Sequence, residues 1–391
     1  MKKIILTALL FCSFLVLQAQ NQIDMVLRSI EANNTQLKAL RELSTAEKLE
    51  NKTGNNLANP EVEITHKPKV KGNFAETGIE ATQAFDFPTA YKFRGQAIDL
   101  ENQRVDLAYN VRSREVLLEA RLLAVSYIHQ KKLVKTLQER NAYAKTLYGA
   151  HEEMFSRGDI NVLERNKTKL FWLETDKSLK LAEVELNATK ADLERMNGNQ
   201  PLMVELDEYN RYDLPLSFDD WFAGIKMNNP SLQLAEKGVQ ASKKQEQLTR
   251  SLNLPKLTAG YVGDLNKEQN RHGFLVSVSV PLWEGRNTVK SKKAQTLAME
   301  YEREDVEYQY HKELKTSYEK AQNTFSMLKE YKEVVDYSSN FGLLQKAFDM
   351  GQLSLIEYLQ ELLIFHSAVD SYLEAERDYY LTVSQLEQWE R

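Results

Sequence analysis

The chain has 391 residues, with 51 basic and 56 acidic side chains and a net charge of −5. Proteins that bind nucleic acid usually carry a basic stripe, so this acidic balance argues against a nucleic-acid partner. Only 15 glycines and 8 prolines interrupt the chain, which leaves room for long helices.

The first residues have the pattern of an export signal. Two lysines at positions 2 and 3 precede an apolar run over 4–17, and Gln18-Ala19-Gln20 provides a cleavage site with a small residue. A run of about 14 apolar residues is too short for a retained membrane-spanning helix. We therefore expect residues 1–19 to be a signal peptide and the mature chain to leave the cytoplasm.

The first mature segment is expected to be a helix followed by a β-hairpin. Residues 23–51 have a helical pattern, which a Gly54-Asn55-Asn56 cluster ends. Over residues 60–87 apolar and polar side chains alternate with period two, on either side of a polar loop at 67–73. This alternation predicts two antiparallel strands of about the length used in membrane barrels.

Long helices are expected after the hairpin. The stretch 91–155 contains no proline and predicts one helix of about 64 residues, or ~96 Å at ~1.5 Å per residue. Gly158 is expected to break it, and a further helix is predicted over 162–197. The linker 199–218 contains two prolines and is expected to be non-helical, with room for a short strand.

The same order of elements is expected after the linker. A helix over 219–251 precedes a hairpin over 255–281, which has a polar loop at 264–271. A proline-free helix over 287–350 and a final helix over 355–391 follow. Near-heptad apolar spacing in the final helix indicates helix-on-helix packing.

The two halves of the chain also share residues at nearly fixed offsets. The motif FSRGDI at 155–160 corresponds to FDMGQL at 348–353, 193 positions later. The Asn-Asn pair at 33–34 corresponds to the pair at 228–229, at an offset of 195. Two similar halves indicate a pseudo-symmetric architecture instead of a single catalytic pocket.

The predicted fold class is mainly α with a small β part. We divide the mature chain into a first repeat, 20–198, a linker, 199–218, and a second repeat, 219–391. Four strands in one chain leave two open sheet edges, which lipid does not tolerate, so strands from several copies would have to close a barrel. Two copies would close a tight barrel of eight strands and three a wider barrel of twelve. A small soluble sheet that caps a periplasmic coiled coil is the alternative.

Taken together, these features resemble the TolC-like outer-membrane efflux factors. The resemblance rests on the duplicated Asn-Asn starts, the proline-terminated hairpins, and the motif Phe-x-x-Gly-x-[Ile/Leu]-x-[Val/Leu]-[Leu/Ile]-Glu at 155–164 and 348–357. It covers essentially all of the mature chain. It implies a duplicated long-helix coiled-coil barrel, with four strands per chain pooled in a homotrimer into a 12-stranded outer-membrane β-barrel.

The resemblance also implies a function. The protein would be the exit duct of a tripartite efflux pump, in contact with outer-membrane lipid and extending far into the periplasm. Its partners would be a periplasmic adaptor protein and an inner-membrane transporter of the RND type. The compact loops resemble those of the heavy-metal cation efflux subgroup. The alternative function is a soluble periplasmic coiled-coil adaptor or scaffold.

By the same resemblance, two sets of residues carry function. The turns at the helical tips would be the adaptor-docking surface, formed by Arg157, Gly158, Asp159, Met350, Gly351 and Gln352. Carboxylates six residues beyond each glycine, Glu164 and Glu357, would line the tunnel entrance. Gln360 stands where the family has a further acidic residue. Ordinary helix–helix turns also need glycine, and solvated helix faces also carry glutamates, so structural roles remain the alternative.

No pattern of catalytic or cofactor-binding residues is visible. The six histidines have no paired ligand spacing, and the only cysteine, Cys12, lies within the expected signal peptide. P-loop, G-x-S-x-G and G-x-G-x-x-G motifs do not occur. We therefore expect no enzyme activity, no cofactor and no metal site.

Overall fold

The computed structural model describes residues 22–68, 75–266, 269–336 and 339–390. The expected signal peptide lies outside these residues. The chain divides into two compact units, and each of them combines segments from both sequence repeats. Of the described residues, unit 1 comprises those within 22–38, 113–225 and 311–390, and unit 2 comprises those within 39–112 and 226–310.

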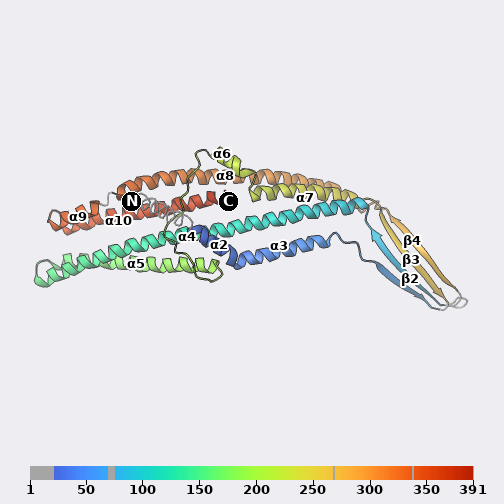
Figure 1. The fold of residues 1–391 in the computed structure, drawn as a ribbon, viewed down its shortest axis with the longest axis horizontal. Coiled ribbons are helices and arrows are strands. Elements are labelled where there is room, and N and C mark those ends of the chain that lie inside the picture. The colour runs from blue at the N-terminus through green and yellow to red at the C-terminus, as the bar shows by residue number, and fades with distance from the viewer. Residues whose placement is uncertain (1–21, 69–74, 267–268, 337–338, 391) are drawn as a thin grey trace, which may run out of the picture. The chain divides into compact units, whose positions relative to one another are not determined.

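Unit 1 consists mainly of helices, both long and short (Figure 1). They are α2 (Gln22–Asn33), the later part of α4 (Pro88–Arg157), α5 (Val162–Met196), α6 (Phe218–Lys226), the later part of α8 (Thr288–Asp336), α9 (Ser339–Asp349) and α10 (Leu355–Glu387). With 70 residues, α4 is ~105 Å long at ~1.5 Å per residue. The helix expected over 287–350 corresponds to α8 and α9, which lie on either side of two residues outside the described part of the chain.

Unit 2 contains α3 (Thr35–Thr53), the first part of α4, α7 (Pro230–Leu252), the first part of α8, and one sheet. The mainly helical fold with a small sheet is therefore confirmed. Two helix predictions were wrong. The stretches 23–51 and 219–251, each predicted as one helix, both form two helices. The described linker residues 199–217 include neither a helix nor the short strand considered there.

Both unexpected breaks fall at the duplicated Asn-Asn pairs. The Oδ1 of Asn34 accepts a hydrogen bond from the backbone N–H of Leu37 at 2.9 Å, and its Nδ2 donates to the carbonyl oxygen of Met196 at 2.8 Å. Asn229 is the N-cap of α7 and accepts from the N–H of Leu232 at 3.1 Å. An asparagine that caps a new helix leaves helical geometry itself, so it also ends the preceding helix.

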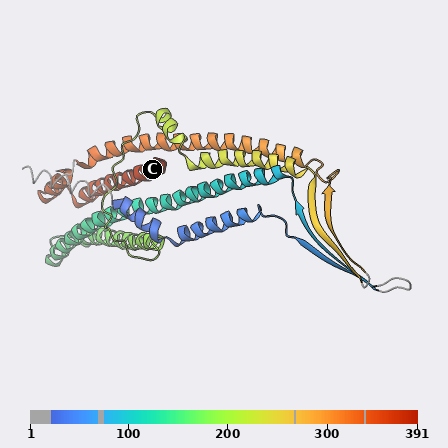
Figure 2. The ribbon, with the colours of Figure 1, turned by 45° about the vertical axis from the view of Figure 1, so that its right-hand side comes forward.

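The sheet in unit 2 has four antiparallel strands in the order β1-β2-β3-β4 (Figures 1 and 2). Their bounds are β1 Glu61–Lys67, β2 Glu76–Phe85, β3 Lys256–Asn266 and β4 Asn270–Ser279. The ladder between β2 and β3 joins the two sequence repeats in one sheet.

The loop between β3 and β4 is shorter than the predicted 264–271. Asp264 pairs with Arg271, and Leu265 pairs with Asn270. Backbone ladder bonds form whatever the polarity of the side chains, and opposite charges that face each other across strands are favourable. The strands therefore continue into the polar stretch.

A buried arginine ties three helices of unit 1 together. The side chain of Arg121, on α4, is 6% exposed. It donates to the carboxylate of Asp24 on α2 at 3.2 Å and contacts the carboxylate of Glu387 on α10. A buried guanidinium requires such paired acceptors, so this cluster fixes α2 and α10 against α4.

The non-helical linker is held on the helices by side chains. Lys131 on α4 donates to Asp207 at 2.5 Å, and the Tyr209 ring stacks on Tyr380 of α10 with centroids 4.3 Å apart. Beneath it, Lys132 lies 3.0 Å from Glu376, whose side chain is only 14% exposed. Burial raises the pKa of Glu376 above its ordinary value, although Lys132 acts in the opposite direction.

Lys132→Met should destabilise the helices by about 2 kcal/mol at neutral pH, because it leaves the partly buried Glu376 carboxylate without its cation. The pKa of Glu376 is raised in the folded state, so the charged form opposes folding once the pH exceeds its unfolded value of 4.5. The loss should therefore be small near pH 4 and grow as the pH rises. Thermal unfolding followed by circular dichroism at both pH values measures it.

The matched control is Lys177→Met, which breaks a pair with Glu174 whose side chains are 65% and 70% exposed. Exposed pairs contribute little, so this change should alter stability by less than about 1 kcal/mol. A loss in Lys132→Met that is equal at both pH values, or equal to that of the control, would contradict the role given to Glu376.

Candidate functional site

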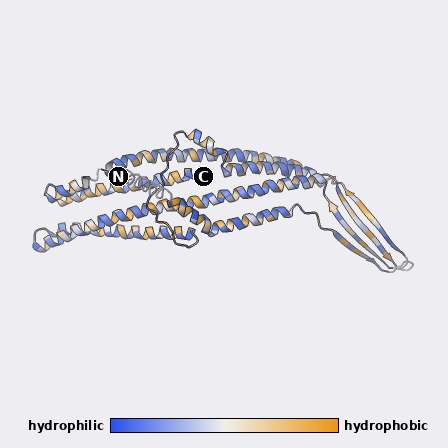
Figure 3. Ribbon diagram, viewed as in Figure 1, coloured by the Kyte–Doolittle hydropathy of each residue, from blue (hydrophilic) through white to orange (hydrophobic). Residues whose placement is uncertain are grey.

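The strand register gives the sheet two chemically different faces. Residues that pair across antiparallel strands lie on the same face, and successive residues alternate between faces. One face, called the apolar face here, carries mainly apolar side chains: Val62, Ile64, Ile79, Ala81, Phe85, Leu257, Ala259, Tyr261, Phe274, Val276 and Val278, with Gln83 and His272 among them. Val62 is 67% exposed, Phe274 94% and Val276 76%. Figure 3 shows the resulting alternation of hydrophobic and hydrophilic residues along the strands.

The polar face carries hydroxyl and charged side chains. Thr258 pairs with Ser277, and Glu63 pairs directly with Glu80. Adjacent like charges are unfavourable unless water or counter-ions screen them, so this face suits an aqueous environment. The strands approach closely here, since a Cβ on Gly260 would lie 2.6 Å from the Thr82 methyl group.

The sheet has two open edges. Among the described strands, β1 and β4 each pair with one neighbour only. A long edge beside an uncovered apolar face is an arrangement that monomeric soluble proteins avoid, because it promotes association. Among the described residues, no helix combines the length and apolar character needed to cross a membrane.

The two predicted tip turns have the same backbone geometry. Gly158 and Gly351 have φ angles of +81° and +72°, which favour glycine. The N–H of Gly158 donates to the carbonyl of Phe155 at 3.0 Å, and that of Asp159 donates to Met154 at 2.9 Å, the Schellman pattern that ends a helix. The second turn has the equivalent bonds, from Gly351 to Phe348 and from Gln352 to Ala347, both 2.9 Å.

The six predicted docking residues occupy these turns, which lie at the same end of unit 1 (Figure 1). Arg157 and Asp159 form an ion pair at 3.5 Å, with side chains 66% and 54% exposed. In the second turn Met350 is 65% exposed and the uncharged Gln352 is exposed as well, so this turn presents no ion pair of its own residues. The two turns thus share a backbone but present different chemistry.

A buried cluster beneath the tips packs α4 against α9 and α10. Leu147, Tyr358 and Leu362 form its core. The Tyr358 ring stacks on Phe348 with centroids 4.5 Å apart, and its hydroxyl contacts the hydroxyl of Tyr143. Burial raises the pKa of Tyr358, so it stays a neutral hydrogen-bonding group. This cluster brings the two tip hairpins together.

The two predicted entrance carboxylates are cap residues. Glu357 is the third residue of α10, and its Oε2 accepts from the N–H of Ser354 at 2.8 Å, while the Ser354 hydroxyl accepts from the N–H of Glu357 at 3.3 Å. This is a capping box. Glu164 has the same place in α5, where Asn161 is the N-cap and donates from Nδ2 to the Glu164 carboxylate at 3.1 Å.

The cap keeps Glu357 ionised. The backbone hydrogen bond from Ser354, followed by that from its hydroxyl, holds the pKa of Glu357 below its ordinary value. The N-terminus of a helix also favours a negative charge. Sequence reasoning missed this role, although Ser-x-x-Glu before an apolar run is a recognisable cap signal.

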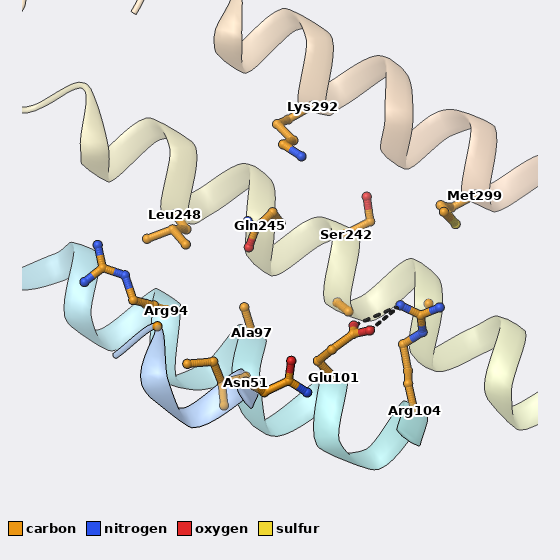
Figure 4. A pocket seen from close by; sticks show the side chains of 14 residues that line it. Asn51, Arg94, Ala97, Glu101, Arg104, Ser242, Gln245, Leu248, Lys292 and Met299 are labelled. Atoms are coloured by element: carbon orange, nitrogen blue, oxygen red, sulfur yellow. Dashed lines mark hydrogen bonds and ion pairs between the residues drawn. The ribbon is translucent and has the colours of Figure 1, made fainter. Parts of the chain in front are cut away.

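The described residues contain two notable clefts. One, of about 480 Å³, lies among α3, α4, α7 and α8 of unit 2. Figure 4 shows the ion pair of Arg104 and Glu101 in it, where Nη1 of Arg104 donates to both carboxylate oxygens, at 2.8 and 2.9 Å. The other, of about 720 Å³, lies among α4, α5 and α10 of unit 1 and includes His366. In the described part of the chain, no group of three or more His, Cys, Asp or Glu residues is placed to hold a metal ion.

Several solved outer-membrane channels have the same fold, and no curated protein matches the chain in sequence. A membrane protein from Pseudomonas aeruginosa aligns with a TM-score of 0.80 and 10% identity, covering 94% of this chain and 92% of that chain. For the CmeC outer membrane channel of Campylobacter jejuni the values are 0.73, 11%, 94% and 85%. For the open-state MtrE outer membrane channel of Neisseria gonorrhoeae they are 0.71, 12%, 95% and 88%.

The fold is therefore that of the long-helix outer-membrane channels. Residues 224–389 match the family described as outer membrane efflux protein. Together with the shared fold, this match confirms the resemblance to the TolC-like outer-membrane efflux family, whose members are channels and not enzymes.

Gly158→Ala should destabilise unit 1 by about 1–2 kcal/mol, because alanine is strained at a positive φ even where space is open. Gly149→Ala is the matched control, since Gly149 lies inside α4 and also has nothing within 4 Å of its Cβ position. The control should stabilise by about 0.5–1 kcal/mol. Thermal unfolding distinguishes the two, and equal shifts would contradict the left-handed geometry of the turn.

Ser354→Ala should destabilise α10 by about 1 kcal/mol and raise the pKa of Glu357 toward its ordinary value of 4.5. Since the folded pKa is depressed, the contribution of the cap is complete above pH 4.5 and is lost as the pH falls through the folded pKa. Carbon-detected NMR titration of the glutamates measures the shift. Ser367→Ala, in the middle of the same helix, should leave the pKa of Glu357 unchanged.

Proposed function

We propose that this protein is the outer-membrane exit duct of a tripartite efflux pump. The uncovered apolar face between two open strand edges carries the proposal. In a bilayer core every backbone N–H and C=O group needs a partner within the protein, so four strands alone do not span it. Pairing the β1 edge of one copy with the β4 edge of the next satisfies both edges at once.

Three copies suit a duct better than two. A barrel of eight strands has an interior that side chains fill, whereas a barrel of twelve encloses a wider lumen. The polar face, with Thr258, Ser277 and the Glu63–Glu80 pair, would line this lumen, and the apolar face would contact lipid. The shared fold of known outer-membrane channels supports this arrangement.

We assign the tip turns of unit 1 to adaptor docking. Arg157, Gly158 and Asp159 would offer an exposed ion pair. Met350, Gly351 and Gln352 would offer an uncharged surface with the apolar Met350 side chain. Glu164 and Glu357 would stand at the tunnel entrance, where three copies of each carboxylate favour cations. The duct conducts passively, and an inner-membrane transporter supplies the energy.

Val276→Arg should prevent assembly in the outer membrane, because a cation on the lipid-facing side of a barrel costs about 2–4 kcal/mol near the bilayer midplane. Ser277→Arg is the matched control. Its side chain lies on the polar face of the same strand, so it should assemble normally. Heat-modifiable gel migration and chemical crosslinking of outer-membrane fractions measure the trimer.

A monomer or dimer of the unaltered protein in the soluble periplasm would refute the duct. Equal assembly of the Val276 and Ser277 variants would refute the assignment of the two faces.

A further inference from the structure

The junctions between helices and strands in unit 2 share one feature. Each of the four carries an exposed apolar side chain: Leu57, 54% exposed, between α3 and β1; Phe87, 38%, between β2 and α4; Leu254, 38%, between α7 and β3; and Leu282 and Trp283, 69% and 81%, between β4 and α8. All four junctions lie at the end of the sheet that faces the helices (Figure 1).

Basic side chains accompany these apolar residues. Five basic side chains near the junctions are exposed and have no ion-pair partner among the described residues: Lys92, Lys256, Arg286, Lys290 and Lys293. They belong to three of the four junctions. In the stretch 282–293, Glu284 is the only acidic residue. The whole chain has a net charge of −5, so this local excess of cations does not follow from composition.

The neighbouring Arg94 shows the contrast. It donates to Asp86 at 2.6 Å, and both side chains are about one fifth exposed or less. The chain therefore provides a partner for a cation that it buries at this level, and leaves the five outer cations to solvent.

We propose that these ten residues form a junction collar that binds the anionic phospholipid headgroups of the membrane leaflet facing the helices. The inference rests on the proposed membrane function. Aromatic and apolar side chains such as Trp283 favour the boundary between the acyl chains and the headgroups. Lys290 and Lys293 lie in the first two turns of α8, within ~8 Å along the helix at ~1.5 Å per residue, which is the depth of a headgroup layer.

The distribution of the cations favours a bilayer surface over a free anion. A site for one phosphate gathers its donors around one point, whereas these cations are spread over three junctions, each beside apolar side chains. A membrane surface offers many phosphates, so it can pair with each of these separated cations. Basic residues next to a membrane-embedded segment are attracted to anionic lipid. The collar would thus fix the depth and orientation of the sheet in the membrane.

The test uses purified trimer in a non-ionic detergent, titrated with dansyl-labelled phosphatidylglycerol or phosphatidylcholine and read by energy transfer from tryptophan. The test variant is the triple substitution Arg286→Gln, Lys290→Gln, Lys293→Gln. Each removed charge should weaken the binding of phosphatidylglycerol by about fivefold, so the triple variant should bind it at least about tenfold more weakly. Its binding of phosphatidylcholine should not change. The control triple Lys135→Gln, Lys167→Gln, Lys169→Gln removes the same charge from exposed sites in unit 1 and should bind both lipids like the unaltered protein.

Two further measurements keep the test decisive if the triple variant does not assemble. Binding of phosphatidylglycerol by the unaltered trimer should fall when salt is raised to about 0.5 M, because screening shortens the reach of exposed charges. Inorganic phosphate at the concentration of the lipid should not displace it.

Equal binding of the two lipids, insensitivity to salt, displacement by phosphate, or an equal loss in the control triple would each overturn the collar. Failure of the unaltered protein to form a trimer in the outer membrane would instead refute the proposed function. The two failures are therefore distinguishable.

Discussion

Hydrogen bonding of the strand backbone is the constraint on which the other features depend. The ladder between β2 and β3 joins strands that lie far apart in the sequence, from Phe85 paired with Leu257 to Glu76 paired with Asn266. Everything between these strands, from α4 to α7, therefore has to leave the sheet and return to it. The long helix α4, which has no proline after its first residue, and the tight turn at Gly158 provide part of that path. The remaining edges, β1 and β4, each have one neighbour among the described strands, and in the proposed duct further copies of the chain would pair with them.

The two halves of the chain share helix caps and turn hydrogen bonds more closely than they share exposed side chains. Asn34 and Asn229 both cap a helix, and both tip turns end in the same pair of hydrogen bonds. The exposed residues of the turns differ, with an arginine–aspartate pair in the first and a methionine in the second. A closed backbone turn is needed wherever two antiparallel helices meet, whereas the surface of each turn is free to serve its own contacts.

Much of the fold follows from local patterns in the sequence. The period-two alternation at residues 79–87 and 274–280 predicts the strands and their apolar face, because that signal does not depend on distant residues. The helix break at Asn229 was also readable, since Pro230 behind an asparagine is a typical helix start. The place where the linker lies on the helices could not be predicted from the sequence. It depends on contacts such as that of Lys131 with Asp207, which are 76 positions apart. Such long-range pairs leave no periodic trace in the sequence.

The cap role of Glu357 bears on its proposed place at the tunnel entrance. A glutamate that caps a helix need not act through its charge. For Glu357, however, the cap supports the proposed electrostatic role. The hydrogen bonds from Ser354 lower the pKa of Glu357 and fix its carboxylate at the start of α10. An exposed glutamate without such a cap would move freely and average out its field. A capped one keeps a fixed negative charge beside the tip turn, and the equivalent place of Glu164 in α5 repeats that arrangement in the first half of the chain.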